Sequence, residues 1–207
     1  DVNAYAASAF YAVDRYASYK QDWGTYYEQG GLVVTDRYTT SNAVHQASKE
    51  PEEKRGAFLK WLYEFEYDKL GLPRPDLVIY LDVPTDFTEK LLRGREAATN
   101  TSADIHEKDM SSFATCRETG RAAAKFYHWT VIDCVRDGAM RSIEDIHDEI
   151  YAHVEAGGDM CSTAAVSEYD YIKVLSKKRE SADEVVQLYV RDIVSTIVTP
   201  DRSLAAF

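Results

Sequence analysis

Cysteine is scarce in this chain of 207 residues, and the three that occur, Cys116, Cys134 and Cys161, lie far apart in the sequence. An odd number of separated cysteines, with no Cys-x-x-Cys pair, argues against a disulfide framework and against a zinc site. We therefore expect these thiols to be ordinary packing residues of a cytoplasmic protein, because the cytosol keeps thiols reduced.

Positive charge is also in short supply, since 24 Lys and Arg face 35 Asp and Glu and the net charge is −11. An acidic surface does not attract nucleic acid or anionic membranes, so neither is an expected partner. No run of apolar residues approaches the length of a membrane span. With 45% hydrophobic residues the chain can still build a sizeable core, and its length suggests one domain with or without an appendage.

Apolar periodicity predicts that helices and strands alternate along the chain. Helices are expected over 2–22, from Pro51 to Gly71, briefly after Asp86, over 109–127 and over 142–154. Strands are expected over 32–35, 77–82 and 130–134. Gly24 and Gly30-Gly31 are predicted to interrupt the first helical pattern, and Phe58, Leu62 and Phe65 to form the buried stripe of the second. This order implies βαβ crossovers, and hence an α/β fold with a parallel sheet covered by helices on both faces.

Two polar stretches break this rhythm. Residues 93–103 have no apolar period and are predicted to form a mobile loop, and Glu155 to Asp159 have the composition of a linker. We accordingly divide the chain into a main domain over 1–155, a linker over 156–168 and an extension over 169–207. The extension is expected to contain a strand near 171–175 and a helix, which either add an edge strand to the sheet or form a small docking unit.

The first predicted strand runs directly into Asp36 and Arg37, and Ser41 and Asn42 follow within five positions. An Asp at the carboxyl end of a buried strand sits where open α/β sheets bind ligands. It can hold a metal-bound water or take a proton, and a neighbouring Arg can grip a phosphate with two hydrogen bonds. On spacing alone, Asp36 and Arg37 fit a common surface ion pair equally well.

Three segments together carry a resemblance to a known family. In chain order they are Phe10-Tyr11-Ala12-Val13-Asp14-Arg15, Asp36-Arg37-Tyr38-Thr39-Thr40-Ser41-Asn42 and Leu77-Val78-Ile79-Tyr80-Leu81-Asp82-Val83-Pro84. From Asp1 to about Val154 the chain resembles the thymidylate kinases, which are nucleoside-monophosphate kinases with a P-loop kinase fold. The resemblance implies transfer of the γ-phosphoryl group of ATP to dTMP, giving dTDP, with Mg²⁺ as the cofactor.

The resemblance implies an acceptor site with several roles. Tyr11 sits where the family stacks an aromatic ring on the thymine, and Arg15 where an arginine reaches the base. Ser41 and Asn42 match polar residues that line the monophosphate site, where an amide can meet the hydrogen-bonding edge of the base. His45 stands where the family often has an aromatic side chain near the sugar, so the sequence departs from the pattern there.

The resemblance also implies the groups around the transferred phosphoryl group. Asp36 matches the acid near that group and its Mg²⁺, and Arg37 matches the arginine that clamps the acceptor phosphate. Arg93 and Arg95 lie in the segment that resembles the family's lid, where arginines close over the phosphates. Family members usually pair through helices, so the resemblance also implies a homodimer, with the aromatic helix over 2–22 as a candidate surface.

One part of the family pattern is missing from these 207 residues. Thymidylate kinases begin with a strand and a Gly-x-x-x-x-Gly-Lys-[Ser/Thr] loop that holds the phosphates of ATP, and no such loop occurs in this sequence. We expect that an amino-terminal piece has been lost, together with the central strand of the sheet. Phosphoryl transfer by residues 1–207 alone is therefore expected to be weak or absent. A non-catalytic nucleotide-binding or interaction module and a deoxynucleoside kinase are the alternatives.

Overall fold

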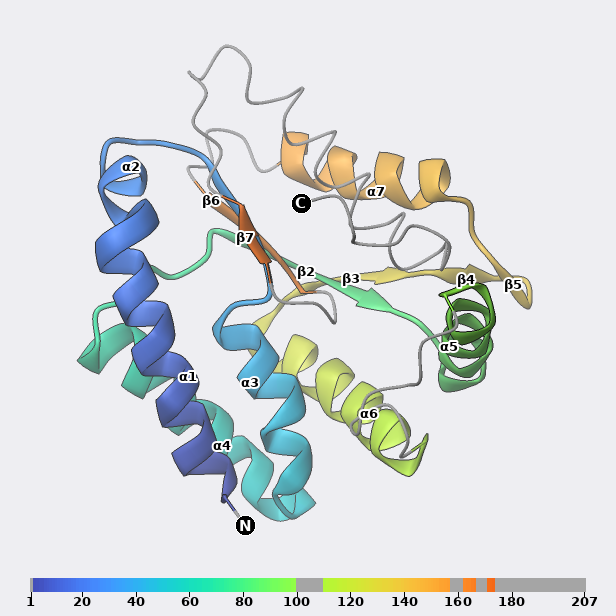
Figure 1. Cartoon of the computed structure of the whole chain (residues 1–207), viewed down its shortest axis with the longest axis horizontal. Helices are drawn as coiled ribbons and strands as arrows, with labels where there is room; N and C mark the ends of the chain where they lie inside the picture. The colour runs from blue at the N-terminus through green and yellow to red at the C-terminus, as the bar shows by residue number, and fades with distance from the viewer. Residues whose placement is uncertain (1, 100–109, 157–161, 167–170, 174–207) are drawn as a thin grey trace.

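The computed structural model describes residues 2–99, 110–156, 162–166 and 171–173, and a five-stranded sheet lies at its centre (Figure 1). The strands are β1 (Val33–Asp36), β2 (Leu77–Asp82), β3 (Thr130–Asp133), β6 (Ser162–Val166) and β7 (Tyr171–Lys173). Their order in the sheet is β3-β2-β6-β1-β7. All pairs are parallel except that between β1 and β7, so β7 is an antiparallel edge strand. The predicted parallel α/β sheet is confirmed, as is an edge strand near 171.

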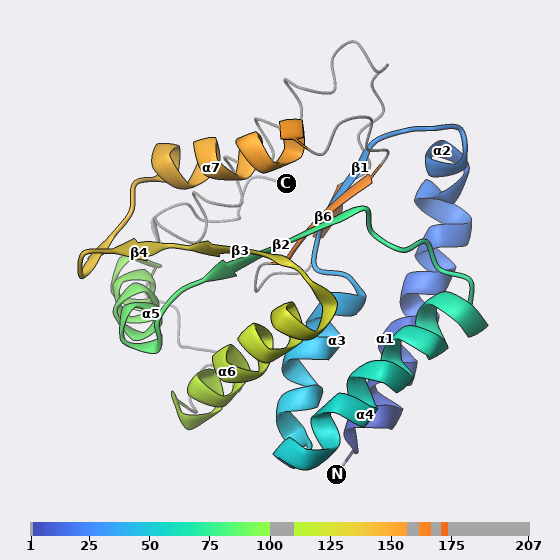
Figure 2. The ribbon, with the colours of Figure 1, turned by 180° about the vertical axis from the view of Figure 1, so that it is seen from behind.

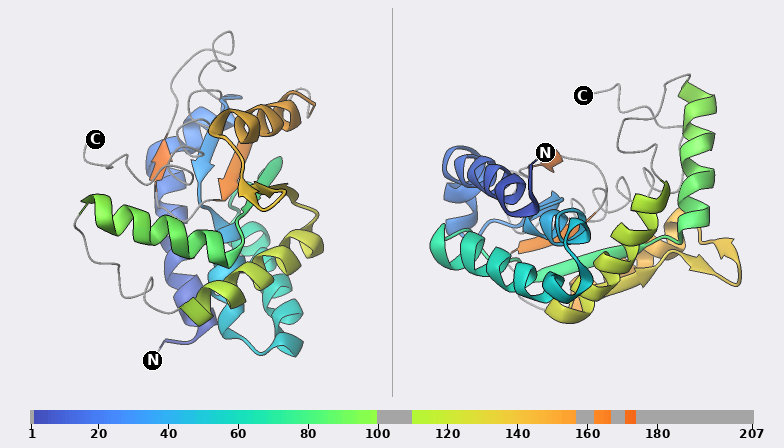
Figure 3. Two further views of the ribbon diagram at one scale, coloured as in Figure 1. Left: turned by 90° about the vertical axis from the view of Figure 1, so that its right-hand side faces the viewer. Right: turned by 90° about the horizontal axis from the view of Figure 1, so that it is seen from below.

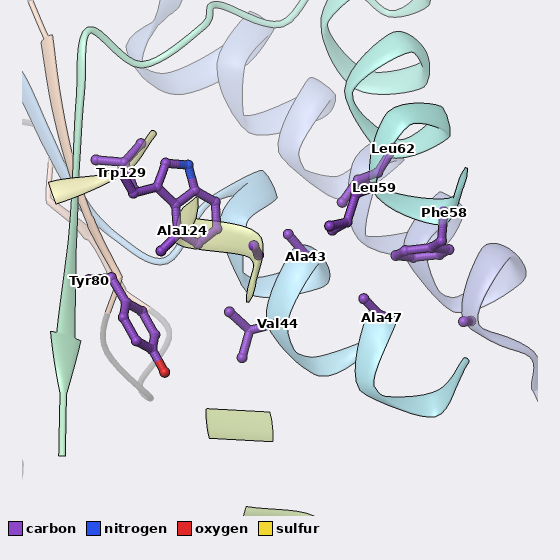
Figure 4. Packing of buried hydrophobic residues seen from close by; sticks show 12 residues of the cluster. Ala43, Val44, Ala47, Phe58, Leu59, Leu62, Tyr80, Ala124 and Trp129 are labelled. Carbon is purple, nitrogen blue, oxygen red and sulfur yellow. The ribbon is translucent and has the colours of Figure 1, made fainter. Parts of the chain in front are cut away.

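Helices cover both faces of this sheet, as the sequence predicted (Figures 1 and 2). The covering helices are α1 (Ala4–Ser18), α3 (Thr39–His45), α4 (Glu52–Tyr63), α6 (Met110–Tyr127) and α7 (Ile143–Ala156). Successive residues of a strand point to opposite faces. Val78 and Tyr80 of β2 accordingly pack with α3, α4 and α6 on one face, whereas Ile79 packs with α7 on the other. Figure 4 shows the cluster on the first face. Among the described residues no helix is both long and apolar enough to cross a membrane.

The first helical segment continues through Gly24, so the prediction of an interruption there is wrong. α1 passes into a π-helical turn, η1 (Tyr19–Trp23), and Gly24 begins α2 (Gly24–Glu28). A Cβ on Gly24 would lie 2.8 Å from the ring of Tyr19 and 2.3 Å from its carbonyl oxygen. The glycine therefore allows a close approach rather than a break. The helical segment extends to Glu28, beyond the predicted end at residue 22, and the interruption predicted at Gly30-Gly31 is confirmed, because Gly30 takes a left-handed backbone with φ of 84°.

The helix that follows Pro51 also changes its winding. α4 becomes a π-helix, η3 (Glu64–Lys69), and the segment ends at Gly71 as predicted. A π-helical turn holds one more residue than an α-turn and so rotates the residues that follow it. Phe58 and Leu62 are buried as expected, but Glu66 and Tyr67 take the buried positions beyond them. The prediction that Phe65 is part of the buried stripe is wrong, since it is only half-buried and stacks on Trp61 at 5.2 Å.

Two predicted irregular stretches contain regular structure. Helix α5 (Thr85–Thr99) is longer than expected and covers residues 93–99 of the predicted loop, while residues 100–109 lie outside the described part of the chain. It stands beyond the carboxyl ends of β2 and β3 (Figure 3). The prediction of a linker over 156–168 is wrong for residues 162–166, which form β6 between β1 and β2. The helix expected beyond residue 181 lies outside the described residues.

A small hairpin was not predicted at all. Strands β4 (Val135–Arg136) and β5 (Ala139–Met140) pair in antiparallel fashion beyond β3. Asp137 and Gly138 connect them with φ of 52° and 75°, both in the left-handed region. Asp-Gly is a strong signal for a two-residue hairpin turn, so the sequence did contain the information.

Candidate functional site

The centre of the site is the turn between β1 and α3, at the carboxyl edge of the sheet. Because β1, β6, β2 and β3 are parallel, the carboxyl ends of β1, β2 and β3 lie at the same edge. β1 is buried along its whole length and ends at Asp36, which is itself buried. The strand thus delivers a carboxylate to the edge where open α/β sheets bind their ligands, as predicted.

Arg37 follows Asp36 with a left-handed backbone, φ of 66°. This region is disfavoured for a residue with a side chain, and such strain concentrates at functional sites. The hydroxyl of Thr35 donates a hydrogen bond to the carbonyl oxygen of Arg37 at 2.9 Å, which helps to hold the turn. The chain then starts α3 at Thr39. The strained turn therefore places Asp36, Arg37 and the first turn of α3 next to one another at the carboxyl edge of the sheet.

Arg37 and His45 occupy opposite ends of this short segment and are in contact. Nη2 of Arg37 lies 3.0 Å from Nε2 of His45. The other ring nitrogen, Nδ1, lies 3.7 Å from Sγ of Cys116 in α6, and that thiol contacts Oγ of Ser48 at 3.4 Å. The structure therefore places the predicted site residues Arg37 and His45 side by side, with Cys116 of α6 in contact with the histidine ring.

A buried carboxylate joins two more of the predicted residues. Glu66 of η3 is fully buried, and its oxygens accept hydrogen bonds from Nε and Nη2 of Arg15 at 2.8 and 2.6 Å. The same carboxylate accepts a hydrogen bond from the hydroxyl of Thr39 at 2.7 Å and one from Nδ2 of Asn42 at 3.3 Å. Glu66 was not singled out in the sequence. Its signal was a charged residue four positions after Leu62, on the face that the apolar pattern buries.

Four of the predicted residues form these contacts, and the others differ in their surroundings. Ser41 lies in α3 between the pairs, and its buried Oγ has no hydrogen-bond partner within the described part of the chain. Tyr11 lies one turn before Arg15 on α1 and is 53% exposed, so its ring is available to a ligand or a partner. Arg93 lies on α5, is exposed and pairs with Glu89 of the same helix. Arg95 belongs to α5, and its side chain lies outside the described part.

A second charged cluster lies at the end of β2. Asp82 is buried and accepts hydrogen bonds from Nε and Nη2 of Arg117 at 2.8 and 2.7 Å, and one from Nη1 of Arg121 at 2.5 Å. Hydrogen bonding to Asp82 raises the pKa of both guanidinium groups above their usual range. The two arginines stand four residues apart on α6, and their partner could not be inferred from the sequence. They add positive charge to the edge of the sheet where β1 also ends.

Comparison with known proteins places the chain in a family. The sequence profile of thymidylate kinases matches residues 1–150. The chain belongs to the thymidylate kinase family. It is 30% identical over 108 residues to the thymidylate kinase of Mycobacterium tuberculosis strain H37Rv. The matched residues make up 52% of this chain and 50% of that protein.

Two further relatives extend the match over more of the chain. The probable thymidylate kinase of Thermococcus onnurineus strain NA1 is 30% identical over 128 residues, 61% of this chain and 53% of that protein. That of Pyrococcus abyssi strain GE5 is 27% identical over 152 residues, 72% and 64% of the two chains. The chain thus spans about half the length of the first two relatives. No solved structure matches it significantly.

Proposed function

We propose that this member of the thymidylate kinase family carries the acceptor half of a dTMP kinase site. The observation that supports this most is the convergence of Arg15 and Asn42 on one carboxylate, together with the contact between Arg37, in the turn before α3, and His45 at the end of that helix. The family resemblance assigns Arg15 and Asn42 to the base and Arg37 to the acceptor phosphate, while His45 stands at the position near the sugar. In the proposed complex, dTMP lies across α3 with its phosphate toward Arg37 and its base toward Arg15 and Asn42.

Arg37 would hold the acceptor phosphate. A guanidinium presents N–H groups in a planar fork that matches two oxygens of a phosphate, and such charge-assisted hydrogen bonds are among the strongest in proteins. The left-handed backbone at Arg37 and its contact with His45 fix the start and the end of this side chain. Binding in a fixed orientation is the main contribution a kinase makes, because phosphoryl transfer requires positioning and charge stabilisation rather than covalent chemistry.

Asp36 would serve the metal. Mg²⁺ in kinases is commonly held by one or two carboxylates and by phosphate oxygens of the substrate. Among the described residues no group of three or more His, Cys, Asp and Glu forms a metal cage, and a single strand-end carboxylate suits an ion that arrives with a nucleotide. When bound, Mg²⁺ would neutralise charge on the phosphates. Asp36 would orient that ion, and the lid arginines Arg93 and Arg95 would approach the phosphates through movement of α5.

The groups assigned above bind the acceptor, and the 207 residues contain no Gly-x-x-x-x-Gly-Lys-[Ser/Thr] loop for the phosphates of ATP. The second candidate is a nucleotide-binding module without catalysis, which would use the same acceptor groups. A deoxynucleoside kinase is less favoured, because it would give Arg37 no acceptor phosphate to hold. We place the protein in the cytosol on the strength of its scattered cysteines, and we keep a homodimer through α1 as a proposal.

Calorimetric titration of the 207-residue chain tests these assignments. We expect dTMP to bind, thymidine to bind at least about tenfold more weakly because it lacks the charged hydrogen bonds to Arg37, and Arg37→Ala to bring the two affinities together. Binding of ATP as well would support the kinase over the module. Failure of dTMP to bind, or equal affinities for dTMP and thymidine, would contradict the proposed acceptor site.

A further inference from the structure

We propose that Glu66 is a positioning residue that sets the base selectivity of the acceptor site, by orienting Arg15 and the side-chain amide of Asn42. The inference rests on the proposed function, because it assigns the base to these two side chains. The ligand class it implies is a nucleotide with a 4-keto pyrimidine, thymine or uracil, in preference to the 4-amino pyrimidine cytosine.

The contacts of Glu66 are those of a hub rather than of a single ion pair. Its carboxylate lies in η3, is fully buried and receives hydrogen bonds from three side chains on two other elements: Arg15 of α1, and Thr39 and Asn42 at the start and middle of α3. Two parallel N–H···O bonds fix the plane of the Arg15 guanidinium. The Arg15 side chain is 12% exposed, whereas that of Glu66 is fully buried.

The carboxylate also decides which way the Asn42 amide points. Nδ2 of Asn42 lies 3.3 Å from Oε1 of Glu66 and 3.5 Å from the carbonyl oxygen of Ser8. Both neighbours are acceptors, so only the NH₂ group of the amide can face them, whereas the opposite orientation would set oxygen against oxygen. The carbonyl oxygen of Asn42 is therefore turned away from Glu66. In this orientation Asn42 offers an acceptor, while Arg15 offers only donors.

One donor next to one acceptor matches the edge of a 4-keto pyrimidine. Thymine presents O4 as an acceptor and N3–H as a donor, which Arg15 and the carbonyl oxygen of Asn42 complement. Cytosine presents an N4 amino donor and an unprotonated N3. It would set donor against donor at Arg15 and acceptor against acceptor at Asn42, and unpaired polar groups of this kind are what makes a polar site selective.

Glu66 lies in the π-helical segment η3. Glu66 lies four residues after Leu62, and both side chains are fully buried. π-Turns occur frequently at functional sites. A purely structural ion pair between Arg15 and Glu66 would need neither the Thr39 nor the Asn42 contact, and it would not affect one base more than another.

The test compares Glu66→Gln with the unaltered chain in titrations with dTMP and dCMP. A glutamine side chain keeps the shape but presents an NH₂ group that allows the Asn42 amide to turn. We expect dTMP affinity to fall about tenfold or more, as for loss of a charge-assisted hydrogen bond, while dCMP affinity changes far less, so that the ratio between them collapses. Asp145→Asn, which removes a carboxylate from the Arg141 ion pair on α7, is the matched control and should leave the ratio unchanged.

If Glu66→Gln does not fold, a second variant and a second measurement still test the proposal. Glu66→Asp keeps the charge but withdraws it by one methylene, and it should reduce the same ratio by a smaller factor. In ¹⁵N NMR spectra without ligand, the Nε–H signal of Arg15, assigned by its absence in Arg15→Lys, should exchange slowly with water in the unaltered chain and rapidly in the folded Glu66 variant.

Each result decides a separate point. An unchanged dTMP-to-dCMP ratio in a folded Glu66 variant would overturn the selectivity role while leaving the proposed function intact. No dTMP binding by the unaltered chain would overturn the proposed function and the selectivity role together. In that case the Arg15 signal would still show whether Glu66 holds the guanidinium.

Discussion

Nη2 of Arg37 lies 3.0 Å from Nε2 of His45, and this contact selects the tautomer of the neutral imidazole. A guanidinium has donors only, so Nε2 must accept and the proton of the neutral ring must sit on Nδ1. Nδ1–H then points toward Sγ of Cys116 at 3.7 Å. His45, which the sequence suggested as a residue near the sugar, thus supports the arginine that we assign to the acceptor phosphate.

Replacing this histidine should weaken phosphate binding without affecting the base. We predict that His45→Ala lowers dTMP affinity by about fivefold to tenfold, the effect of losing one ordinary hydrogen bond, because Arg37 is then held less firmly. Thymidine has no phosphate for Arg37 to hold, so its affinity should change by less than about twofold. Titration calorimetry measures both, with His153→Ala on the exposed side of α7 as the control. Equal losses for dTMP and thymidine would place His45 at the sugar or base instead.

Arg37 should also show that function and stability conflict in this turn. Its φ of 66° is a conformation that glycine adopts readily, whereas any other L-residue loses about 1 kcal/mol or more there. We predict that Arg37→Gly has a free energy of unfolding about 1 kcal/mol higher than Arg37→Ala, while both variants lose dTMP binding to a similar extent. Urea denaturation compares the two directly. A less stable glycine variant would mean that the turn does not take this conformation in solution.

Two glycines in helices test the packing of α6 on the sheet. A Cβ on Gly120 would lie 2.4 Å from the hydroxyl of Tyr80 in β2, whereas a Cβ on Gly56 in α4 meets nothing within 4 Å. Gly56→Ala should stabilise the protein by about 0.5–1 kcal/mol through helix propensity alone. Gly120→Ala should destabilise it by roughly 1–3 kcal/mol, because the added methyl overpacks the core. If both substitutions stabilise the protein in thermal unfolding, α6 does not pack on β2 as described.

The Arg141–Asp145 ion pair at the start of α7 should make the free energy of unfolding depend on pH in the acidic range. Nε of Arg141 donates to Oδ2 of Asp145 at 2.6 Å, and this hydrogen bond lowers the pKa of the Asp145 carboxyl below its ordinary value of 3.8. A carboxyl whose pKa is lower in the folded state stabilises the fold at pH values above that ordinary value and loses this contribution as the pH falls through the folded pKa. We predict that Asp145→Asn is less stable than the unaltered chain at pH 6 and that the difference shrinks below pH 3.8.

Chemical denaturation between pH 6 and pH 2.5 measures this effect, and Asp133→Asn serves as the control because its contact with Arg121 is longer, at 3.4 Å, and solvent-exposed. A constant stability difference between the unaltered chain and Asp145→Asn across that range would show that Arg141 does not lower the pKa of Asp145.

The fold was predictable where local pattern and burial agree. The apolar runs that end at Asp36 and Asp82 identified β1 and β2, and the alternation of strands with helices gave the parallel sheet. β6 was not predicted, because Ser162 to Val166 is a short stretch of mainly small residues whose partners lie more than 80 positions away in the chain. Strand pairing over such a distance leaves no local trace.

The site was predictable only in part for a similar reason. Arg15, Arg37, Asn42 and His45 were proposed from the resemblance to thymidylate kinases, and the structure joins Arg37 with His45 and links Arg15 and Asn42 through Glu66. Glu66 and Arg117 were missed because their roles depend on tertiary contacts with Arg15 and Asp82.

The most direct test of the account is an NMR titration of the ¹⁵N-labelled 207-residue chain with dTMP. We predict that backbone amide signals from Asp36 to His45, together with those around Tyr11 and Arg15, shift in a saturable manner, while signals of the outer side of α7 stay in place. Shifts that are confined to other elements, or no saturable shift at millimolar dTMP, would contradict an acceptor site built on Arg15, Arg37 and Asn42.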